Sequence, residues 1–289
     1  MCSMLIGVTG SRGVLGRRIA HCLREHGHDV RVFEGDVRNQ GEVRSWRDGL
    51  DQVVHCAALV PMTKVHSDPK QALEVNVLGS LNVAAALDPK EKVHLTYIST
   101  SHVYKRRSGP IAESDLPEPG SLYGLTKLQG EQWVRALAPR HLIIRVFSFF
   151  APDQSTDFLV PGLATRILAA PAGVSLDLAS PESVRDLADA DWVGRVCAKL
   201  VLSGQTGVVN CGAGRGYKVA EIADKLACAL HRNDLKWNRT GRDEKDSFDS
   251  LVADTKRLRT ILGQIPPFDF EQALKRFAAE IRERIGEHG

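Results

Sequence analysis

The stretch "SMLIGVTGSRGVLG", residues 3–16, decides the fold class. Its first half is a short apolar run, typical of a strand buried in a parallel sheet. Its second half places Gly10, Gly13 and Gly16 at GxxGxxG spacing, and a helical pattern follows over residues 14–27. Glycine permits a tight turn and lets backbone N–H groups approach a pyrophosphate, which the helix N-terminus also attracts. A plain glycine-rich turn is the alternative, but the place between a strand and a helix favours a dinucleotide-binding loop.

Strand and helix patterns alternate through the rest of the first half. They cover residues 28–35, 40–49, 51–58, 67–87, 92–100, 121–138 and 140–150, with a strand pattern first and last. The long helical pattern at 67–87 has Leu73 and Leu78 in its apolar stripe. Alternation with short connections implies a mostly parallel sheet covered by helices on both faces. We therefore predict an α/β fold, a Rossmann-type doubly wound parallel sheet, with ligands beyond the carboxyl ends of its strands.

The second half of the chain is less regular. Helical patterns cover 158–170, 189–203, 218–231 and 271–285, and short strand patterns cover 174–178 and 207–212. The polar stretch 232–247 is predicted as a surface loop or edge. We predict a dinucleotide-binding domain over residues 1–150, to which 189–212 returns, and a smaller substrate-binding lobe over 151–289.

Composition narrows the class of protein. The 289 residues carry a net charge of +3 that is spread along the chain, so we expect neither a nucleic-acid nor a membrane partner. The N-terminus lacks the basic leader and apolar core of a signal peptide, and no apolar run reaches the roughly 18–20 residues of a spanning helix. Six scattered cysteines without a CxxC pair indicate a reducing compartment, the cytoplasm. The histidines of "HGH" at 26–28 lie in a glycine-centred turn, and we expect no metal site.

The segment "SLYGLTKLQG", residues 121–130, places Tyr123 and Lys127 four residues apart in the first turns of a helical pattern. Side chains at that spacing are neighbours on one helix face. A phenol beside an ammonium is either a coincidence on a solvated surface or a device for proton transfer.

Two strand ends bear on this choice. The strand pattern at 51–58 ends with Ala57 and Ala58, which leave room for a flat ligand. The pattern at 92–100 ends in a run of hydroxyls, Ser99, Thr100 and Ser101. In a parallel sheet these ends share one edge with the glycine loop, and the helix that carries Tyr123 is expected to begin there.

Taken together, these motifs resemble an extended short-chain dehydrogenase/reductase of the nucleotide-sugar epimerase/dehydratase group. The similar segments are the glycine loop, "VVHCAA", "NVLGSLNV" at 76–83, "STSHVY", "YGLTKLQGE" and "VNCGAG" at 209–214. Their order and spacing agree over nearly the whole chain. The resemblance implies a nicotinamide cofactor and a nucleotide-linked sugar as substrate.

The resemblance also implies roles for residues. Tyr123 would be the general acid/base, although an ordinary phenol has a pKa of about 10. Lys127 would favour the phenolate, together with the positive charge of an oxidised nicotinamide, and would hold the nicotinamide ribose. Thr100 would bond the reacting oxygen, with Ser101 as the alternative or as a substrate contact. Asn76 would support the cofactor site through backbone and water contacts.

One segment departs from the family pattern. In "VRVFEGDVRN", residues 30–39, the second strand runs directly into "GDV", as if a strand–helix unit were deleted. Glu34 would contact the adenosine ribose and Asp36 the adenine side, in a pocket shallower than usual.

The same segment bears on the choice of cofactor. Arg12, inside the glycine loop, could reach the 2′-phosphate of NADP, assisted by Arg31 and Arg38. Glu34 argues for NAD, because an acid repels that phosphate. The cations favour NADP, with NAD as the alternative.

The second half resembles the family's substrate lobe. Ser148 stands where many members have an asparagine that contacts sugar or phosphate. Arg185, in "SVRDLADADWV", matches an arginine that often reaches a nucleotide diphosphate, a task that suits bidentate contacts. A surface ion pair with a nearby aspartate is an equally good interpretation of Arg185.

The resemblance favours an oxidoreductase that moves hydride between sugar C4 and nicotinamide. Family dehydratases place an Asp–Glu pair after the catalytic threonine, and Ser101 and His102 stand there instead. That argues against dehydration. The shortened adenosine segment and the compact length favour a 4-keto-6-deoxysugar reductase with exchangeable NADPH. The alternatives are a 4-epimerase with tightly bound NAD and a non-catalytic, dinucleotide-binding regulatory relative. A homodimer through the helix with Tyr123 is a family expectation.

Overall fold

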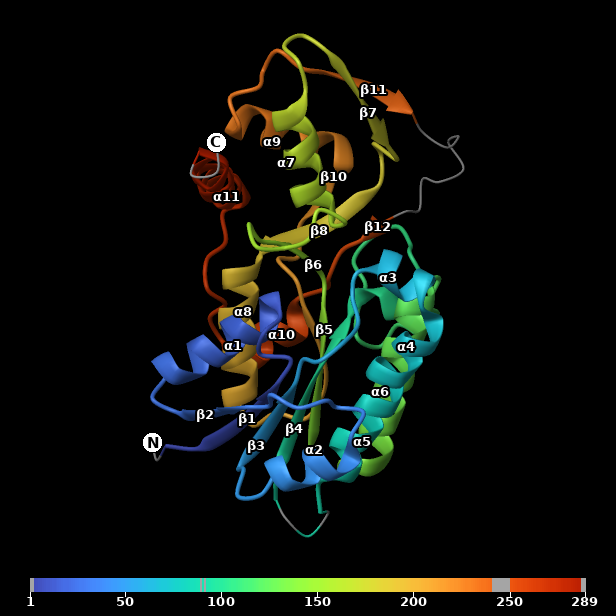
Figure 1. Cartoon of the computed structure of the whole chain (residues 1–289), viewed down its shortest axis with the longest axis vertical. Coiled ribbons are helices and arrows are strands. Elements are labelled where there is room, and N and C mark those ends of the chain that lie inside the picture. The colour runs from blue at the N-terminus through green and yellow to red at the C-terminus, as the bar shows by residue number, and fades with distance from the viewer. Residues whose placement is uncertain (1–2, 89, 91, 241–249, 287–289) are drawn as a thin grey trace.

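A computed structural model describes residues 3–88, 90, 92–240 and 250–286 of the chain (Figure 1). Its central element is a sheet of six parallel strands in the order β2-β1-β3-β4-β5-β9. The strands are β1 (Leu5–Thr9), β2 (Asp29–Val32), β3 (Gln52–His55), β4 (His94–Thr100), β5 (His141–Val146) and β9 (Gly207–Cys211). The predicted α/β fold with a parallel sheet is confirmed.

Helices cover both faces of this sheet (Figure 1). One face carries α1 (Val14–Glu25) and α8 (Ala190–Leu202), and the other carries α2 (Gln40–Trp46), α5 (Gly79–Ala85) and α6 (Leu122–Leu137). The inner strands β3, β4 and β5 are buried along nearly their whole length, because helices cover both of their faces.

The first strand shows how the two layers are packed. Ile6 and Val8 are fully buried in the core that α1 and α8 share. Gly7, between them, faces the opposite layer, where an added Cβ would lie 2.3 Å from the Leu50 side chain and 2.7 Å from that of Trp46. Glycine in this strand therefore lets α2 and its indole lie directly on the sheet.

The helix predicted over 67–87 is present over residues 69–85, where α4 (Pro69–Leu73), a π-helical turn (Glu74–Leu78) and α5 follow one another without a gap. A separate short helix, α3 (Met62–Ser67), precedes it. The Asp68 side chain caps α4 by accepting from the Gln71 N–H, and Pro69 takes the first helical position, where its missing N–H is tolerated. The π-helical turn shifts the phase of the helix, so the predicted apolar stripe holds only in part: Ala84 is buried, whereas Leu73 and Leu78 are 44% and 43% exposed.

The second half builds a smaller layer beyond the carboxyl end of β5. The predicted strand 140–150 breaks after β5, and β6 (Ser148–Phe150) pairs instead with β8 (Val184–Asp189). The other elements of this part are α7 (Leu159–Ala169), β7 (Ser175–Ala179), β10 (Gly216–Lys218), α9 (Val219–Ala229), β11 (Lys236–Thr240), β12 (Ser250–Leu251) and α11 (Phe270–Gly286). All of them except β12 contribute to a separate apolar core, in which the rings of Tyr217 and Phe270 stack with their centroids 4.2 Å apart.

The chain crosses between the two parts more than once. Beyond β8, α8 and β9 return to the central sheet, and α10 (Lys256–Leu262) packs beside β9. Of the polar stretch predicted as a loop or edge, residues 236–240 form β11, and 241–247 lie outside the described residues. The division into a cofactor domain and a substrate lobe stays a prediction. No helix in the described part of the chain is long and apolar enough to span a bilayer.

Candidate active site

The glycine loop connects β1 to α1 at the carboxyl edge of the sheet. Gly10 has a positive φ of 66°, and a Cβ there would lie 2.6 Å from the backbone nitrogen of Ala57. A Cβ on Gly16 would lie 2.3 Å from the Gly10 carbonyl oxygen, so the helix packs directly on the turn. At Gly13 a Cβ would meet only that same oxygen, at 3.2 Å, and the N-terminus of α1 stays open on its other side. This geometry fits a pyrophosphate at the helix N-terminus.

A cavity of about 550 Å³ adjoins this loop and brings together five residues predicted for the cofactor: Gly10, Arg12, Glu34, Asp36 and Ala57. The Ala57 N–H donates to the Thr9 hydroxyl, which fixes the end of β3 against the loop, and Ala58 follows directly. The lining of glycine backbone, one arginine and three acidic residues, Glu34, Asp36 and Glu42, suits the adenosine half of a dinucleotide.

The three arginines predicted at this site have different surroundings. Arg12 donates from Nη2 to the Glu34 carbonyl oxygen at 3.0 Å, on the rim of the cavity. Arg31 donates to the backbone carbonyls of Trp46 and Asp48, on the side of α2.

Arg38, the third, is held in ion pairs. It bonds Asp36 at 2.6 Å and Glu74 at 3.2 Å. Its hydrogen bonds lower the pKa of the Asp36 carboxyl. Of the three arginines, Arg12 lines the cavity beside the glycine loop and Arg31 lines the neighbouring one, and contact of any of them with a cofactor stays a prediction.

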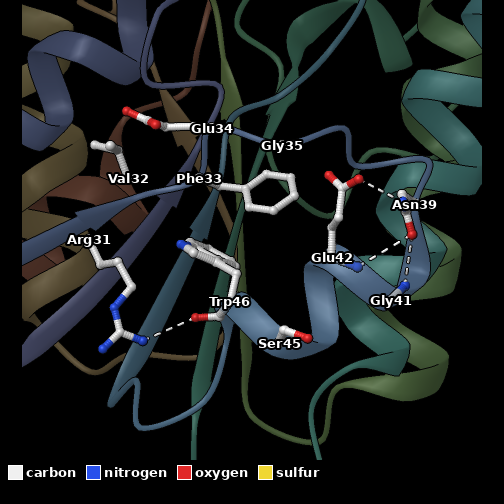
Figure 2. A pocket seen from close by; sticks show the side chains of 10 residues that line it. All are labelled: Arg31, Val32, Phe33, Glu34, Gly35, Asn39, Gly41, Glu42, Ser45 and Trp46. Atoms are coloured by element: carbon white, nitrogen blue, oxygen red, sulfur yellow. Dashed lines mark hydrogen bonds between the residues drawn. The ribbon is translucent and has the colours of Figure 1, made fainter.

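A second, wider cavity of about 840 Å³ lies between β2 and α2 (Figure 2). The rings of Phe33 and Trp46 form one wall, with their centroids 5.0 Å apart, and Figure 2 shows the Glu34 carboxylate pointing away from them. Only α2 connects β2 to β3, and β2 is the edge strand. The adenosine side is therefore a broad surface with an aromatic wall at the place where the sequence departs from the family pattern.

The predicted reaction centre forms where α6 begins. Ser121 caps the helix by accepting from the Gly124 N–H at 3.1 Å. A Cβ on Gly124 would lie 2.1 Å from the His102 carbonyl oxygen, so glycine allows the helix to start directly against the turn that follows β4. This contact brings the Tyr123 phenol close to the Thr100 side chain, which acts to lower the pKa of the phenol.

Burial shifts the pKa values of both Tyr123 and Lys127. Burial raises the pKa of Tyr123 to about 12, although Thr100 partly opposes the shift. Lys127 is 2% exposed, and burial lowers its pKa to about 7 while the nearby Cys56 and Glu131 act in the opposite direction. A solvated surface lysine is thus excluded, because the amine lies inside the protein.

Asn76 ties this centre to the end of β3. It is fully buried in the π-helical turn, and its amide exchanges hydrogen bonds with the backbone N–H and C=O of Leu59. The same amide donates to the Thr126 hydroxyl at 3.1 Å, and that hydroxyl donates to the Tyr123 carbonyl. The predicted backbone contact is present, and it positions the helix that carries Tyr123.

A buried charged network behind the centre was missed by sequence reasoning. Arg145 of β5 donates to both carboxylate oxygens of Glu131 at 2.9 and 2.7 Å, and Ser99 donates to the same carboxylate at 2.6 Å. Arg145 and Glu131 are 2% and 0% exposed. The available signal was an arginine inside an apolar strand pattern, since a buried charge requires a partner.

The three residues predicted for the substrate lie in the 3-10 turn after β4 and in the strands β6 and β8. Ser101 follows Thr100 and is buried. Ser148 lies in β6 and Arg185 in β8, and these strands pair with each other. Arg185 donates to the Val184 carbonyl oxygen at 2.9 Å. Contact of these three with a substrate stays a prediction.

Comparison with known proteins identifies relatives of this arrangement. A family model described as the RmlD substrate binding domain matches residues 4–190. A GDP-6-deoxy-D-mannose reductase of Pseudomonas aeruginosa is 26% identical over 97% of this chain and 98% of its own. A probable low-salt glycan biosynthesis reductase, Agl14, of Haloferax volcanii is 32% identical over 76% of this chain and 78% of its own.

The fold has close solved counterparts. The structure of RMD from Pseudomonas aeruginosa complexed with NADPH superposes with a TM-score of 0.84 at 24% identity, covering 98% of this chain and all of that one. At that identity the superposition supports the fold alone.

Proposed function

Since the chain belongs to the family of the RmlD substrate-binding domain, within the extended short-chain dehydrogenases/reductases, we propose that it is a reductase of a 4-keto-6-deoxy nucleotide sugar. The observation that carries the proposal is a buried Tyr123 phenol that lies close to Thr100 and whose pKa burial raises to about 12. The phenol is protonated at neutral pH, which is the state that can give a proton to the oxygen of a ketone. The Pseudomonas relative that matches over nearly its whole length is a GDP-6-deoxy-D-mannose reductase, which supports a deoxysugar.

The chain's own residues divide the work as follows. A bound NADPH supplies the hydride. Tyr123 gives its proton to the carbonyl oxygen, and the Thr100 hydroxyl holds the same oxygen in place. Proton transfer of this kind contributes about 10²–10⁴-fold to the rate. Lys127 holds the nicotinamide ribose and, when protonated, stabilises the phenolate that remains.

For the cofactor we propose NADPH, which exchanges at every turnover. Arg12 lies on the rim of the adenosine cavity with a guanidinium suited to a 2′-phosphate. The Glu34 carboxylate, an argument for NAD, points away from the aromatic wall in Figure 2.

We also propose that the protein acts in the cytoplasm, because the cysteines in the described part of the chain are free. We further propose that it forms a homodimer through the exposed face of α6. Leu125 and Trp133 on that helix are 43% and 40% exposed, which is large for apolar side chains. Sedimentation of the purified protein tests the oligomer directly.

The test of the function is the consumption of NADPH with a panel of 4-keto-6-deoxy nucleotide sugars. Epimerisation of UDP-glucose and UDP-N-acetylglucosamine without added cofactor is measured in parallel. We expect NADPH consumption with at least one keto sugar. Epimerisation by protein that carries tightly bound NAD would overturn the proposal in favour of an epimerase. Binding of NADPH without any turnover would favour the regulatory relative.

A further inference from the structure

Tyr97 lies directly beneath the reaction centre and has no role in the account above. It occupies the middle of β4, pairs with His55 of β3 and Ile143 of β5, and is fully buried. Its ring reaches under α6, where Gly130 leaves the space. A Cβ on Gly130 would lie 2.2 Å from the Tyr97 hydroxyl oxygen. The helix and the strand are therefore fitted to each other at this tyrosine.

Both ends of Lys127 contact this one side chain. The Lys127 Nζ lies 4.1 Å from the centroid of the Tyr97 ring. The Tyr97 hydroxyl donates a hydrogen bond of 3.4 Å to the Lys127 backbone carbonyl. The ring holds the ammonium while the hydroxyl holds the helix backbone, so a residue of β4 fixes the depth of Lys127 under the cleft.

The titratable groups near Lys127 on the elements packed against it, besides Tyr97, are His55, Cys56, Tyr123 and Glu131. Burial lowers the pKa of His55 and raises those of Cys56 and Tyr123, so these three are neutral at pH 7. The charge of Glu131 is already engaged by Arg145 at 2.7 Å. The negative face of the Tyr97 ring is thus a principal compensation for the buried ammonium.

We propose that Tyr97 is a positioning residue, which holds the ammonium of Lys127 against the face of its ring and so keeps it charged beneath the cofactor. The meaning of that charge for turnover rests on the proposed function, whereas the contact itself does not. A cation over an aromatic face is stabilised most when both are desolvated, as they are here. The Tyr97 hydroxyl helps to position α6 on β4 and is not needed to keep the Lys127 ammonium charged.

The electrostatics of the ring can be separated from its shape. Tyr97→Phe removes the hydroxyl and keeps the negative ring face. Pentafluorophenylalanine at the same position keeps the ring and reverses the sign of its quadrupole. Each protein, and the wild type, is compared with the same chain carrying Lys127→Met. The readout is the free energy of unfolding in urea from about pH 5 to about pH 10, without any ligand.

The sign of the expected effect follows from linkage. The pKa of Lys127 is lowered to about 7 in the folded chain, whereas an unfolded lysine has a pKa of about 10.4. Between these values the unfolded chain binds more protons, so stability relative to Lys127→Met rises with pH, starting near pH 7. With pentafluorophenylalanine we expect the rise to start lower by about one pH unit. With Phe it starts where the wild type does.

Two results would overturn the inference. One is the same starting pH in all three proteins, and the other is an equal shift with Phe and with pentafluorophenylalanine, which would assign the effect to the hydroxyl. If pentafluorophenylalanine prevents folding, 3,5-difluorophenylalanine gives the same comparison with a smaller shift. The experiment contains no sugar or cofactor, so its failure is distinct from failure of the reductase proposal, which turnover decides.

Discussion

The reaction centre and the adenosine side of the cleft are built in opposite ways. At the reaction centre, Lys127, Glu131 and Arg145 are buried, and each is fixed by contacts from a neighbouring strand or helix. On the adenosine side, Arg38 and Glu34 are exposed, on a loop at the edge of the sheet. Arg38 is held there by ion pairs on the surface.

This difference predicts which substitutions have large effects and which have small ones. A buried charge that loses its partner is penalised strongly, because water cannot replace the partner. An exposed ion pair contributes little, because water and salt screen it. Substitutions at the reaction centre are therefore expected to have large effects, and those at the adenosine edge small ones.

The largest expected effect is at Tyr123, and its absence would break the comparison. Tyr123→Phe keeps the ring and its packing but removes the proton that the ketone receives. We expect kcat to fall by at least about 100-fold, with little change in the dissociation constant for NADPH. Steady-state kinetics and a fluorescence titration measure the two quantities. Turnover close to that of the wild type would remove Tyr123 from the mechanism.

The next effect is on stability, at the buried pair behind the centre. Glu131→Gln leaves the Arg145 guanidinium buried without a counter-charge, and we expect a loss of about 3–5 kcal/mol in the free energy of unfolding. The control is Glu131→Gln combined with Arg145→Met, which removes both charges and is expected to recover most of the loss. Urea unfolding measures both proteins. A single variant as stable as the wild type would contradict the importance of burial here.

A smaller effect at Arg12 would sharpen the comparison on the adenosine side. Arg12→Ala removes the cation on the cavity rim, and we expect the dissociation constant for NADPH to rise about tenfold. Binding of NADH is expected to stay unchanged, since it lacks the 2′-phosphate. Arg31→Ala is the matched control, because Arg31 donates to carbonyls on the side of α2. Equal weakening of NADH and NADPH by Arg12→Ala would refute the assignment.

The smallest effect is expected at Arg38. This arginine already pairs with Asp36 and Glu74 on the surface, so Arg38→Ala should change NADPH binding by no more than about threefold. The measurement is the same titration at low and at high salt. An effect that exceeds the one at Arg12 would mean that Arg38 leaves its acidic partners to meet the cofactor.

The same contrast explains what could be predicted from the sequence. The glycine loop and the helix with Tyr123 were predictable because each combines local chemistry with a definite place in the order of strands and helices. The helix predicted over 67–87 is present over residues 69–85, but its predicted apolar stripe was partly wrong because the π-helical turn changes which residues face the core. An apolar pattern that repeats every 3.6 residues assumes a regular α-helix, so it does not reveal a π-helical turn that rotates the following residues around the helix axis.

Contacts between residues that are far apart in the chain could not be predicted from the sequence either. The burial of Lys127 depends on Tyr97, thirty residues earlier on a strand, and on the space left at Gly130. The pairing of β6 with β8 likewise joins segments that no local pattern connects. At the edge strand, the deletion was visible in the sequence, but the aromatic wall of Phe33 and Trp46 required the packing of α2 on Gly7.

The central claim is that the reaction centre reduces a ketone with a hydride from exchangeable NADPH. The most direct measurement uses NADPH deuterated at the transferred position, together with a 4-keto-6-deoxy nucleotide sugar, and locates the label in the product by NMR. We predict deuterium on C4 of the product sugar, and no transfer by Tyr123→Phe on the same time scale. Turnover of nucleotide sugars without any label in the product would contradict the account, because the hydride would then come from a cofactor that never leaves the protein.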